Sequence, residues 1–458
     1  MTGSFWTGVF DPKWIPSSVL RLAKALLERG YQAYIVGGAL RDLLLGLSPH
    51  DFDIATDARP DQIQAVFARS VPVGAAFGSV LVEAEPGLWV DVTTFRRDLE
   101  YVDGRRPVGV KYGVSVEEDL ARRDFTVNAM AWDVSSERLV DPFGGMEDLE
   151  ARWIRAVGDP VRRFREDALR LLRAVRFAAV LDFDIELETW RALEVEAPGI
   201  RRLSAERVRD ELFKILAASD VGRALWMMRE SGLLFEALPE LKGTDRLFQG
   251  KKGAPTLLDH LIQTAAHCPP DPLLRLAGLV HDLGKVKTRA IESHGRLTFH
   301  GHAEVSAEEA RLLGRRLRLS NREIERLAWL VEMHMSLGPS TGTKALRRWL
   351  AQRGEDGVRD LVALCRADAW ASGWEGAVAH LDWIEREIEE IQRSGEALTR
   401  DKLAINGRDV MRELGIGPGP KVGRILEELY QRVLEDPSVN TRERLVELLH
   451  RISGKKEQ

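Results

Sequence analysis

The chain has 458 residues, of which 44% are hydrophobic and 30% charged, and its net charge is −5. This length predicts three or four domains, and this composition is typical of a globular protein. No run approaches the roughly 20 apolar residues of a membrane span, which excludes a membrane-spanning protein, and the first residues lack the features of a signal peptide. Two cysteines without metal-type spacing, Cys268 and Cys365, favour the reducing cytoplasm.

The first informative segment runs from Tyr34 to Asp57. Tyr34–Val36 is predicted to be a short buried strand, and Gly37-Gly38 permits a sharp turn with close approach to a ligand. Ala39–Leu45 has helical character, so its free N–H groups could receive a phosphate. A second strand is expected over residues 50–54 because its side chains alternate in polarity.

Two aspartates in this second strand, Asp51 and Asp53, would share one face and could hold a divalent cation together. A lone pair of this kind is common on polar loops, and a lone glycine pair is usually only a turn. Their combination on a strand–turn–helix–strand frame predicts nucleotidyl transfer.

Two further groups of residues fit that chemistry. Asp91 lies in a predicted strand, Leu88–Thr94, and is a candidate third acid; the alternative is an aspartate that caps a turn. Arg122 and Arg123 offer forked donors to triphosphate oxygens, and Asp124 can accept from a sugar hydroxyl, whereas the alternative is a surface ion pair.

The chain is almost wholly helical in pattern after about residue 150. Residues 152–176 hold eight arginines and three acidic residues, a local balance of +5 that can meet phosphates on an acidic protein. On one predicted helix, Asp167 can accept and Arg170 can donate, as in the reading of a base edge. An i,i+3 salt bridge is the alternative. Glu166, Arg173 and Arg176 continue the same stripe.

These segments in this order resemble the class II tRNA nucleotidyltransferases, the family of the CCA-adding enzymes and bacterial poly(A) polymerases. The resemblance covers residues 31 to about 240, and residues 405–449 resemble the C-terminal segment of longer members. It implies an α/β head with a polymerase-beta-like mixed sheet, followed by an elongated all-α body. It also implies template-independent addition of CCA, or of its terminal A, to the 3′ end of tRNA from CTP and ATP.

The resemblance assigns roles residue by residue. Asp51 and Asp53 would hold catalytic Mg²⁺, with Asp91 as a further acid. The triphosphate, sugar and base would be held by Gly37, Gly38, Arg41, Arg123, Asp124, Asp167 and Arg170, with Glu166 orienting Arg170, and Arg173 and Arg176 in support. Helices from about 180 to 245 and the last 80 residues would contact the acceptor and T arms of tRNA.

Two loops distinguish alternative activities within the family. Poly(A) polymerases typically carry a basic segment where this chain has residues 72–79, which favours CCA addition. The loop over residues 97–118, including Asp103–Pro107, is complete, unlike the loop of CC-adding members. Full CCA addition and terminal A addition both remain open.

A second chemistry is indicated further along. Seven of the ten histidines lie between His260 and His334, and the run LVHDLGK resembles the HD superfamily of metal-dependent phosphohydrolases. The resemblance implies a second divalent metal of unknown identity, with His281 and Asp282 adjacent on a helix. The full set of expected ligands is His260, His281, Asp282, His302, His334 and Asp368. His267, His294 and His300 are expected at the surface without a role.

The predicted domains are a catalytic head over 1–160, a helical neck over 161–247, an HD-type helical domain over 248–375, and a C-terminal helical tail over 376–458. A different class of function also stands as a hypothesis: an HD phosphohydrolase whose N-terminal half only binds nucleotide or RNA. The intact Asp51–Asp53 pair favours the nucleotidyltransferase.

Overall fold

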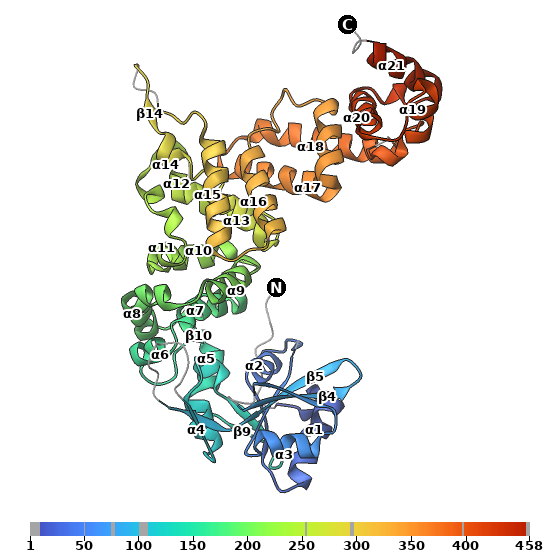
Figure 1. Ribbon diagram of the computed structural model, residues 1–458. Coiled ribbons are helices and arrows are strands. Elements are labelled where there is room, and N and C mark those ends of the chain that lie inside the picture. Colours follow the sequence, from blue (N-terminus) through green and yellow to red (C-terminus); the bar gives the residue numbers. More distant parts are fainter. Residues whose placement is uncertain are drawn as a thin grey trace. The chain divides into compact units, whose positions relative to one another are not determined.

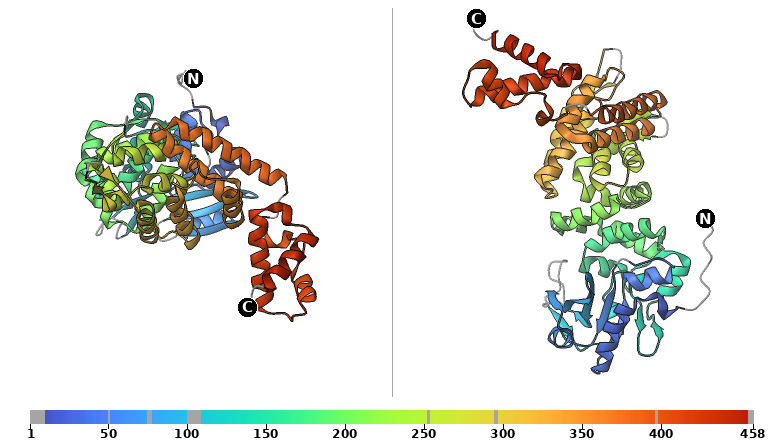
Figure 2. Two further views of the ribbon diagram at one scale, coloured as in Figure 1. Left: turned by 90° about the horizontal axis from the view of Figure 1, so that it is seen from above. Right: turned by 90° about the vertical axis from the view of Figure 1, so that its right-hand side faces the viewer.

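The computed structural model describes residues 10–49, 51–74, 78–99, 109–251, 254–293, 297–395 and 398–454. The chain divides into two compact units, residues 1–239 and 240–458. The long strands all belong to the first unit, and the second is built mainly of helices (Figures 1 and 2). Among the described residues, the helices are too short or too polar to span a bilayer.

The first unit contains a seven-stranded mixed sheet in the order β3-β4-β5-β2-β1-β8-β9. Its strands are β1 (Ala33–Val36), β2 (Asp53–Thr56), β3 (Ser70–Gly74), β4 (Ser79–Glu85), β5 (Leu88–Thr94), β8 (Ala131–Asp133) and β9 (Arg138–Val140). Only β2 and β5 pair in parallel; the other neighbours are antiparallel. This mixed sheet confirms the predicted α/β head.

Helices surround this sheet and continue beyond it. They are α1 (Ser17–Glu28), α2 (Gly38–Leu44), α3 (Pro60–Val66), α4 (Val116–Ala121), α5 (Gly145–Ala151), α6 (Pro160–Glu166), α7 (Leu169–Leu181), α8 (Leu187–Glu196), α9 (Ala205–Leu216), α10 (Val221–Glu230) and α11 (Leu233–Ala237). Short strands form two small pairs: β6 (Arg96–Asp98) with β7 (Val110–Tyr112), and β10 (Trp153–Ile154) with β11 (Asp184–Ile185). All four residues of β1 are buried, and Tyr34 and Val36 pack in one cluster with Leu120 of α4. This packing fixes the strand that leads into the glycine turn.

The second strand of the motif starts later than predicted. Strand β2 begins at Asp53, so Asp51 precedes it and is exposed, and His50 lies outside the described residues. The cause is the partner strand: β1 ends at Val36, which is the register partner of Asp53, and Gly37 turns away with φ +75°. The pairing therefore has no continuation toward Asp51.

The arginine-rich helix is also interrupted where one helix was predicted. Asp167 has an extended backbone, with φ −148° and ψ 105°, and separates α6 from α7. Its carboxylate accepts a hydrogen bond from the backbone N–H of Leu169 at 3.1 Å, so Asp167 satisfies a free donor in the first turn of α7. Glu166 and Arg170 consequently lie on two different helices.

The second unit contains an antiparallel pair of β12 (Phe248–Lys251) and β13 (Ala254–Thr256), which starts at the domain boundary predicted near residue 248. Its helices are α12 (Leu257–His267), α13 (Pro272–Val280), α14 (Lys285–Thr288), α15 (His302–Arg316), α16 (Asn321–Met333), α17 (Thr343–Ala371), α18 (Glu375–Arg393), α19 (Gly407–Leu414), α20 (Pro420–Glu435) and α21 (Arg442–Gly454). Short strands β14 (Ala290–Ile291) and β15 (Leu297–Thr298) form a second hairpin. The last three helices share a buried cluster that includes Val410, Leu429 and Leu449.

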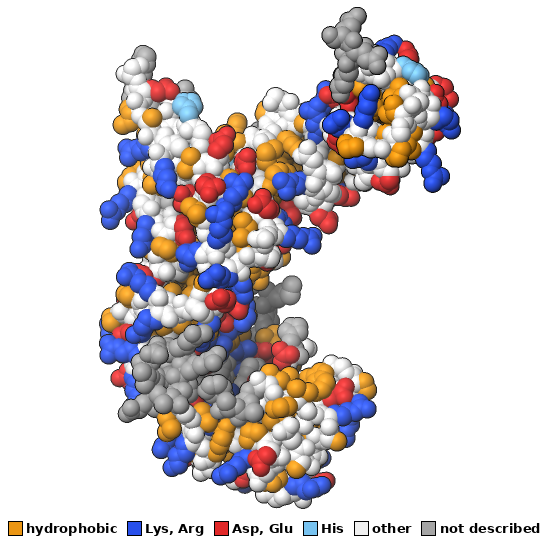
Figure 3. Space-filling model, in the orientation of Figure 1, with side chains coloured by type: hydrophobic (Ala, Val, Ile, Leu, Met, Phe, Trp, Pro, Cys, Tyr) orange, Lys and Arg blue, Asp and Glu red, His pale blue; other side chains and the backbone are white. Residues whose placement is uncertain are grey.

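Charged side chains of both signs are interspersed over the surface of each unit on the face shown in Figure 3. Lys and Arg therefore form no uniform basic coat on that face, in keeping with the net charge of −5. Any recognition of phosphates has to come from local groups of arginines.

Candidate active site and metal cluster

A cavity of about 530 Å³ in the first unit brings most of the predicted head residues together. Its walls are Gly37, Gly38, Arg41, Asp53, Arg122, Arg123, Asp124, Asn128, Asp167, Leu169, Arg170, Arg173, Phe177 and Arg207. Four other predicted residues, Asp51, Asp91, Glu166 and Arg176, do not line the cavity. Three of them neighbour residues that do: Asp91 is the register partner of Asp53, Glu166 accepts from Arg170, and Arg176 contacts the ring of Phe177.

The glycine turn is required by a close approach to an acid. A Cβ atom at Gly37 would lie 2.9 Å from Oδ2 of Asp53 and 3.2 Å from Nη1 of Arg123. The residue also has φ +75°, a conformation that favours glycine. Gly37 thus lets an acid and a cation meet the backbone at the cavity wall.

Two carboxylates lie on adjacent interior strands of the sheet, and a third, Asp51, precedes the first of these strands by two residues. Asp53 of β2 is the register partner of Asp91 on the parallel strand β5. Burial raises the pKa of Asp53 to about 6; Arg123 opposes this, and the negative charges of Asp91 and Asp51 add to it. Burial also raises the pKa of Asp91, although hydrogen bonds from Thr93 and Ser79 lower it. Mutual repulsion of this kind is what a bound cation relieves.

These acids fit Mg²⁺, a hard cation that takes oxygen ligands. The ligand atoms of Asp51, Asp53 and Asp91 do not form a closed group of three within 4.8 Å among the described residues. Mg²⁺ usually binds one or two carboxylates and completes its octahedron with water and substrate phosphates. Asp51, Asp53 and Asp91, which leave coordination positions free beside the cavity, fit this mode of Mg²⁺ binding.

Arg123 and Asp124 are part of a buried network rather than the surface ion pair considered as the alternative. Nη1 of Arg123 donates to the backbone oxygen of Asn128 at 3.3 Å, and Nε of Arg173 donates to Asp124 at 2.7 Å. Burial would raise the pKa of Asp124, but Arg173 and Asn128 hold it below its ordinary range. Asp124 is therefore an ionised acceptor at the cavity wall.

The salt-bridge alternative requires the side chains of Asp167 and Arg170 to pair with each other, and instead each pairs with another residue. Arg170 donates from Nη1 to Glu166 at 2.9 Å and from Nη2 to the backbone oxygen of Arg122 at 3.0 Å. Asp167 accepts from Nη2 of Arg207 at 2.7 Å. Because each side chain is held by its own partners, Asp167 as an acceptor and Arg170 as a donor line the cavity independently.

Four residues of the cavity wall, Asn128, Leu169, Phe177 and Arg207, were not predicted from the sequence. Asn128 links Arg41 to Asp124. Its Oδ1 accepts a hydrogen bond from Nη1 of Arg41 at 2.7 Å, and its Nδ2 donates to Asp124 at 3.1 Å. Phe177 and Arg207 complete the wall. Asn128 follows Asp124 by four residues in a motif already noted, which is a usable signal. Arg207 is 40 residues from its partner, and nothing local indicates it.

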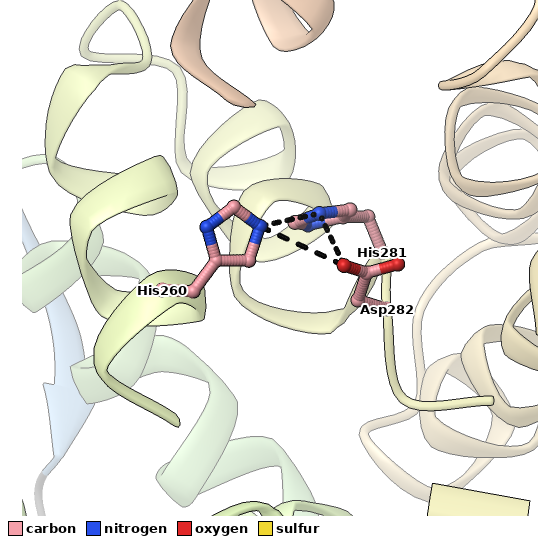
Figure 4. Close-up of side chains that lie close together, drawn as sticks. All are labelled: His260, His281 and Asp282. Carbon is pink, nitrogen blue, oxygen red and sulfur yellow. Dashed lines mark hydrogen bonds and ion pairs between the residues drawn. The ribbon is translucent and has the colours of Figure 1, made fainter. Parts of the chain in front are cut away.

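The second unit gathers the predicted histidines and acids around Asp282. Nε2 of His281 lies 3.3 Å from Oδ2 of Asp282, and Nε2 of His260 lies 3.6 Å from the same oxygen (Figure 4). On the other side, Nε2 of His302 and Nε2 of His334 lie 3.2 and 3.5 Å from Oδ1 of Asp282. Two candidate metal positions result, each with ligand atoms within 4.8 Å of one another, and they share one carboxylate.

Asp368 of α17 closes the cluster. Its Oδ1 lies 3.1 Å from Nε2 of His260. Burial raises the pKa of Asp368, but the hydrogen bond with His260 and the nearby His281 ring hold it below its ordinary range. Its side chain is 28% exposed, whereas the side chains of His260 and His281 are fully buried. Asp368 therefore marks the side from which solvent can enter.

The histidine rings are oriented as metal ligands require. The Nδ1 atoms of His281, His302 and His334 each donate to a backbone carbonyl, at 2.9, 2.8 and 2.7 Å. The carbonyl can only accept, so the neutral ring carries its proton on Nδ1 and its lone pair on Nε2, toward Asp282. Lys285, which the sequence analysis did not single out, donates to Oδ2 of Asp282 at 2.5 Å.

The local structure around LVHDLGK differs from the prediction. His281 and Asp282 directly follow α13, which ends at Val280, instead of lying within a helix. The chain turns there because Gly284 packs against α15, where a Cβ atom would lie 2.1 Å from the backbone oxygen of His302. His300 is exposed, and His267 ends α12 at the surface. His294 lies outside the described residues.

Comparison with known proteins relates the whole chain to one family. Family models match in three segments: the poly A polymerase head domain at 33–155, the probable RNA and SrmB-binding site of polymerase A at 182–244, and the tRNA nucleotidyltransferase domain 2 at 297–449. A CCA-adding enzyme of Geobacillus thermodenitrificans is 36% identical over 432 residues, which cover 93% of this chain and 94% of that protein. The chain belongs to the CCA-adding enzyme family.

Other members agree with this assignment. A CCA-adding enzyme of Bacillus licheniformis is 47% identical over 224 residues, 49% of this chain and 56% of that protein. The crystal structure of the Bacillus stearothermophilus CCA-adding enzyme in complex with CTP covers 98% of this chain and 99% of its own, with a TM-score of 0.73 and 30% identity. The family predicted from the motifs is confirmed, and with it a tRNA nucleotidyltransferase. The loop comparison stays a prediction, because residues 75–77 and 100–108 lie outside the described residues.

Proposed function

We propose that the protein adds CCA to the 3′ end of tRNA from CTP and ATP in the cytoplasm, without a nucleic-acid template. The observation that carries the proposal is a single cavity lined by Asp53, Asp167 and Arg170. An acid for metal and triphosphate chemistry and a donor–acceptor pair for a base thereby share one space. The solved relative at 30% identity binds CTP, which supports the same ligand here.

In this proposal the residues of the head hold the triphosphate. Asp51 and Asp53 would bind Mg²⁺, and Arg41 and Arg123 would donate to phosphate oxygens while Asp124 accepts from the sugar. Bound Mg²⁺ would lower the pKa of the RNA 3′-hydroxyl and neutralise the leaving pyrophosphate. Attack at the α-phosphate is in line, and positioning by these side chains supplies much of the rate.

The protein itself would select the base. Asp167 accepts from the exocyclic amino group that cytosine and adenine share, and Arg170 donates to a ring acceptor. Uracil and guanine present a carbonyl where the amino group is needed, which leaves a buried carboxylate facing an acceptor. Discrimination by such unpaired groups is strong.

Primer extension tests the proposal. The substrates are three tRNA transcripts that end at the discriminator base, at C and at CC, each with Mg²⁺ and with single NTPs or with CTP plus ATP. Stepwise addition of C, C and A to the shortest transcript is expected. Extension of the CC-ended transcript alone, by ATP alone, would instead make the protein an A-adding enzyme, and long A tails would make it a poly(A) polymerase.

The cluster around Asp282 supports a second activity, a metal-dependent phosphohydrolase of HD type. Six imidazole and carboxylate side chains of the second unit converge there, and four rings, those of His260, His281, His302 and His334, present Nε2 toward Asp282. Such mixed ligands suit transition metals such as nickel, manganese or iron, and a metal-bound water would be the nucleophile. Lys285 lies beside the cluster and could meet a phosphate.

This activity is tested on the full chain with Asp53→Asn, which leaves the second unit unchanged. The protein is loaded with Mn²⁺ or Ni²⁺ and given bis-p-nitrophenyl phosphate and a tRNA with a 2′,3′-cyclic phosphate. Hydrolysis that depends on the metal and disappears in Asp282→Asn is expected. Full metal occupancy without hydrolysis of either substrate would make the cluster structural.

A further inference from the structure

Three guanidinium groups surround one aromatic ring at the wall of the nucleotide cavity. The carbon centres of Arg41, Arg173 and Arg176 lie 5.1, 5.1 and 4.2 Å from the ring centre of Phe177. The ring itself is 7% exposed and meets Phe125 edge to face at 5.8 Å. One phenyl group thus contacts three cations.

The cations come from two parts of the first unit. Arg41 lies on α2, directly after the glycine turn, whereas Arg173 and Arg176 lie on α7 with Phe177. Each guanidinium has a separate acidic partner: Asp42 for Arg41, Asp124 for Arg173 and Glu211 for Arg176. Phe177 is the contact that all three share.

Three like charges this close repel one another. Burial lowers the pKa of Arg176, and the charge of Arg173 lowers it further although Glu211 opposes both. An aromatic face carries negative charge density and attracts a cation without using any of its N–H donors. A guanidinium that stacks on the ring keeps its donors free in its own plane for carboxylates and phosphates. An aliphatic side chain of similar size would fill the space without this attraction.

We propose that Phe177 is a positioning residue for the nucleotide: its ring holds Arg41 and Arg173 at the cavity wall, with Arg176 behind them, in the arrangement that receives the triphosphate and sugar. This inference rests on the proposed nucleotidyl transfer. The polyphosphate and sugar are common to CTP and ATP, so Phe177 acts equally on both and leaves base selection to Asp167 and Arg170.

The test replaces Phe177 with 4-fluoro-, 3,5-difluoro- and 3,4,5-trifluorophenylalanine in the full chain. Each fluorine weakens the negative face of the ring and changes its size little. We expect the Kd of CTP and of ATP, and their KM, to rise stepwise with the number of fluorines, while kcat and the CTP-to-ATP ratio stay constant. Phe177→Leu should weaken both nucleotides about 3- to 10-fold.

The control is the same fluorine series at Phe95, a buried ring that packs against Tyr34 in the head core. Its nucleotide Kd values should not move. Thermal unfolding of every variant separates misfolding from weakened binding. A flat fluorine series at Phe177, in a protein that binds and adds nucleotides, would overturn this inference alone. A wild-type chain that neither binds nor adds CTP or ATP would overturn the proposed function, and this inference with it.

Discussion

Asp53 and Asp91 are register partners on β2 and β5, the only neighbouring strands of the seven-stranded sheet that run in parallel. The pairing places two carboxylates on adjacent strands. Burial and the negative charges of Asp91 and Asp51 raise the pKa of Asp53, although Arg123 opposes them. Carboxylates buried this close together destabilise each other's charged forms, and a bound divalent cation offsets that cost.

Substitution of these two acids should have unequal effects. Asp53→Asn removes a proposed metal ligand, and loss of several kcal/mol of transition-state stabilisation lowers kcat about 1000-fold. Asp91→Asn should mainly raise the Mg²⁺ concentration needed for half-maximal rate. Single-turnover nucleotide addition across a Mg²⁺ series measures both. Asp61→Asn, an exposed acid at the start of α3, is the matched control and should resemble the wild type. Equal losses for Asp61→Asn and Asp53→Asn would contradict the assignment.

The pH dependence of activity should depend on Mg²⁺. The pKa of Asp53 in the free protein is about 6, above its ordinary value, so the proton leaves only as the pH rises through 6. Metal binding needs the carboxylate, and therefore the apparent Mg²⁺ affinity falls as the pH drops below about 6. At subsaturating Mg²⁺ the rate of nucleotide addition, measured as a function of pH, should fall below about pH 6. Added Mg²⁺ should shift this decrease in rate to lower pH.

The same shift has a signature in stability. The folded state binds the proton on Asp53 more tightly than the unfolded state does. Protonation of Asp53 therefore contributes to the free energy of unfolding at low pH, and this contribution is lost as the pH rises from about 4 through 6. Mg²⁺ should restore the loss above pH 6. Melting temperatures at several pH values, with and without Mg²⁺, test this against Asp53→Asn, in which the Mg²⁺-dependent part should vanish.

Base selection should respond to Asp167 more than to its neighbours. Asp167→Asn replaces an acceptor by an amide that can also donate, so a carbonyl base is no longer rejected. We expect the preference for CTP over UTP to drop about 10- to 100-fold, the value of one well-placed donor–acceptor pair. Competition between CTP and UTP on a tRNA that ends at the discriminator base measures it. Glu206→Gln, an exposed acid on α9, should keep the preference.

The two metal positions of the second unit should respond differently to substitution. Asp282 belongs to both candidate groups and His302 to one, so Asp282→Asn should remove all bound transition metal, whereas His302→Ala should leave part of it. Metal content by mass spectrometry after dialysis against Mn²⁺ or Ni²⁺ gives the stoichiometry. His300→Ala, at an exposed position, is the control. Nucleotide addition should be unchanged in all three, and equal metal content in all three would rule out the cluster as a metal site.

Local sequence patterns predicted the strands and helices of the head. Contacts between residues distant in the sequence determine where some of these elements begin and which side chains meet. The strand of Leu88–Thr94 and the helix after Gly38 follow from alternation and from the glycine turn, which depend on neighbouring residues. The start of β2 depends on where its partner strand ends. The break at Asp167 depends on a side chain that accepts a hydrogen bond from the backbone N–H of Leu169. Arg207 is brought to Asp167 from another helix, which periodicity cannot reveal.

Every residue that lines the cavity of the first unit precedes Pro239, and every residue of the cluster around Asp282 follows Glu240. Substitutions that erase His260, His281 or Asp368 therefore touch no residue of the cavity. Over evolutionary time, a lineage could lose the imidazole and carboxylate ligands by drift while selection for mature tRNA ends keeps the first unit intact. A survey of relatives should find the two sets of residues inherited separately, with the cluster present or absent among chains that share the same cavity.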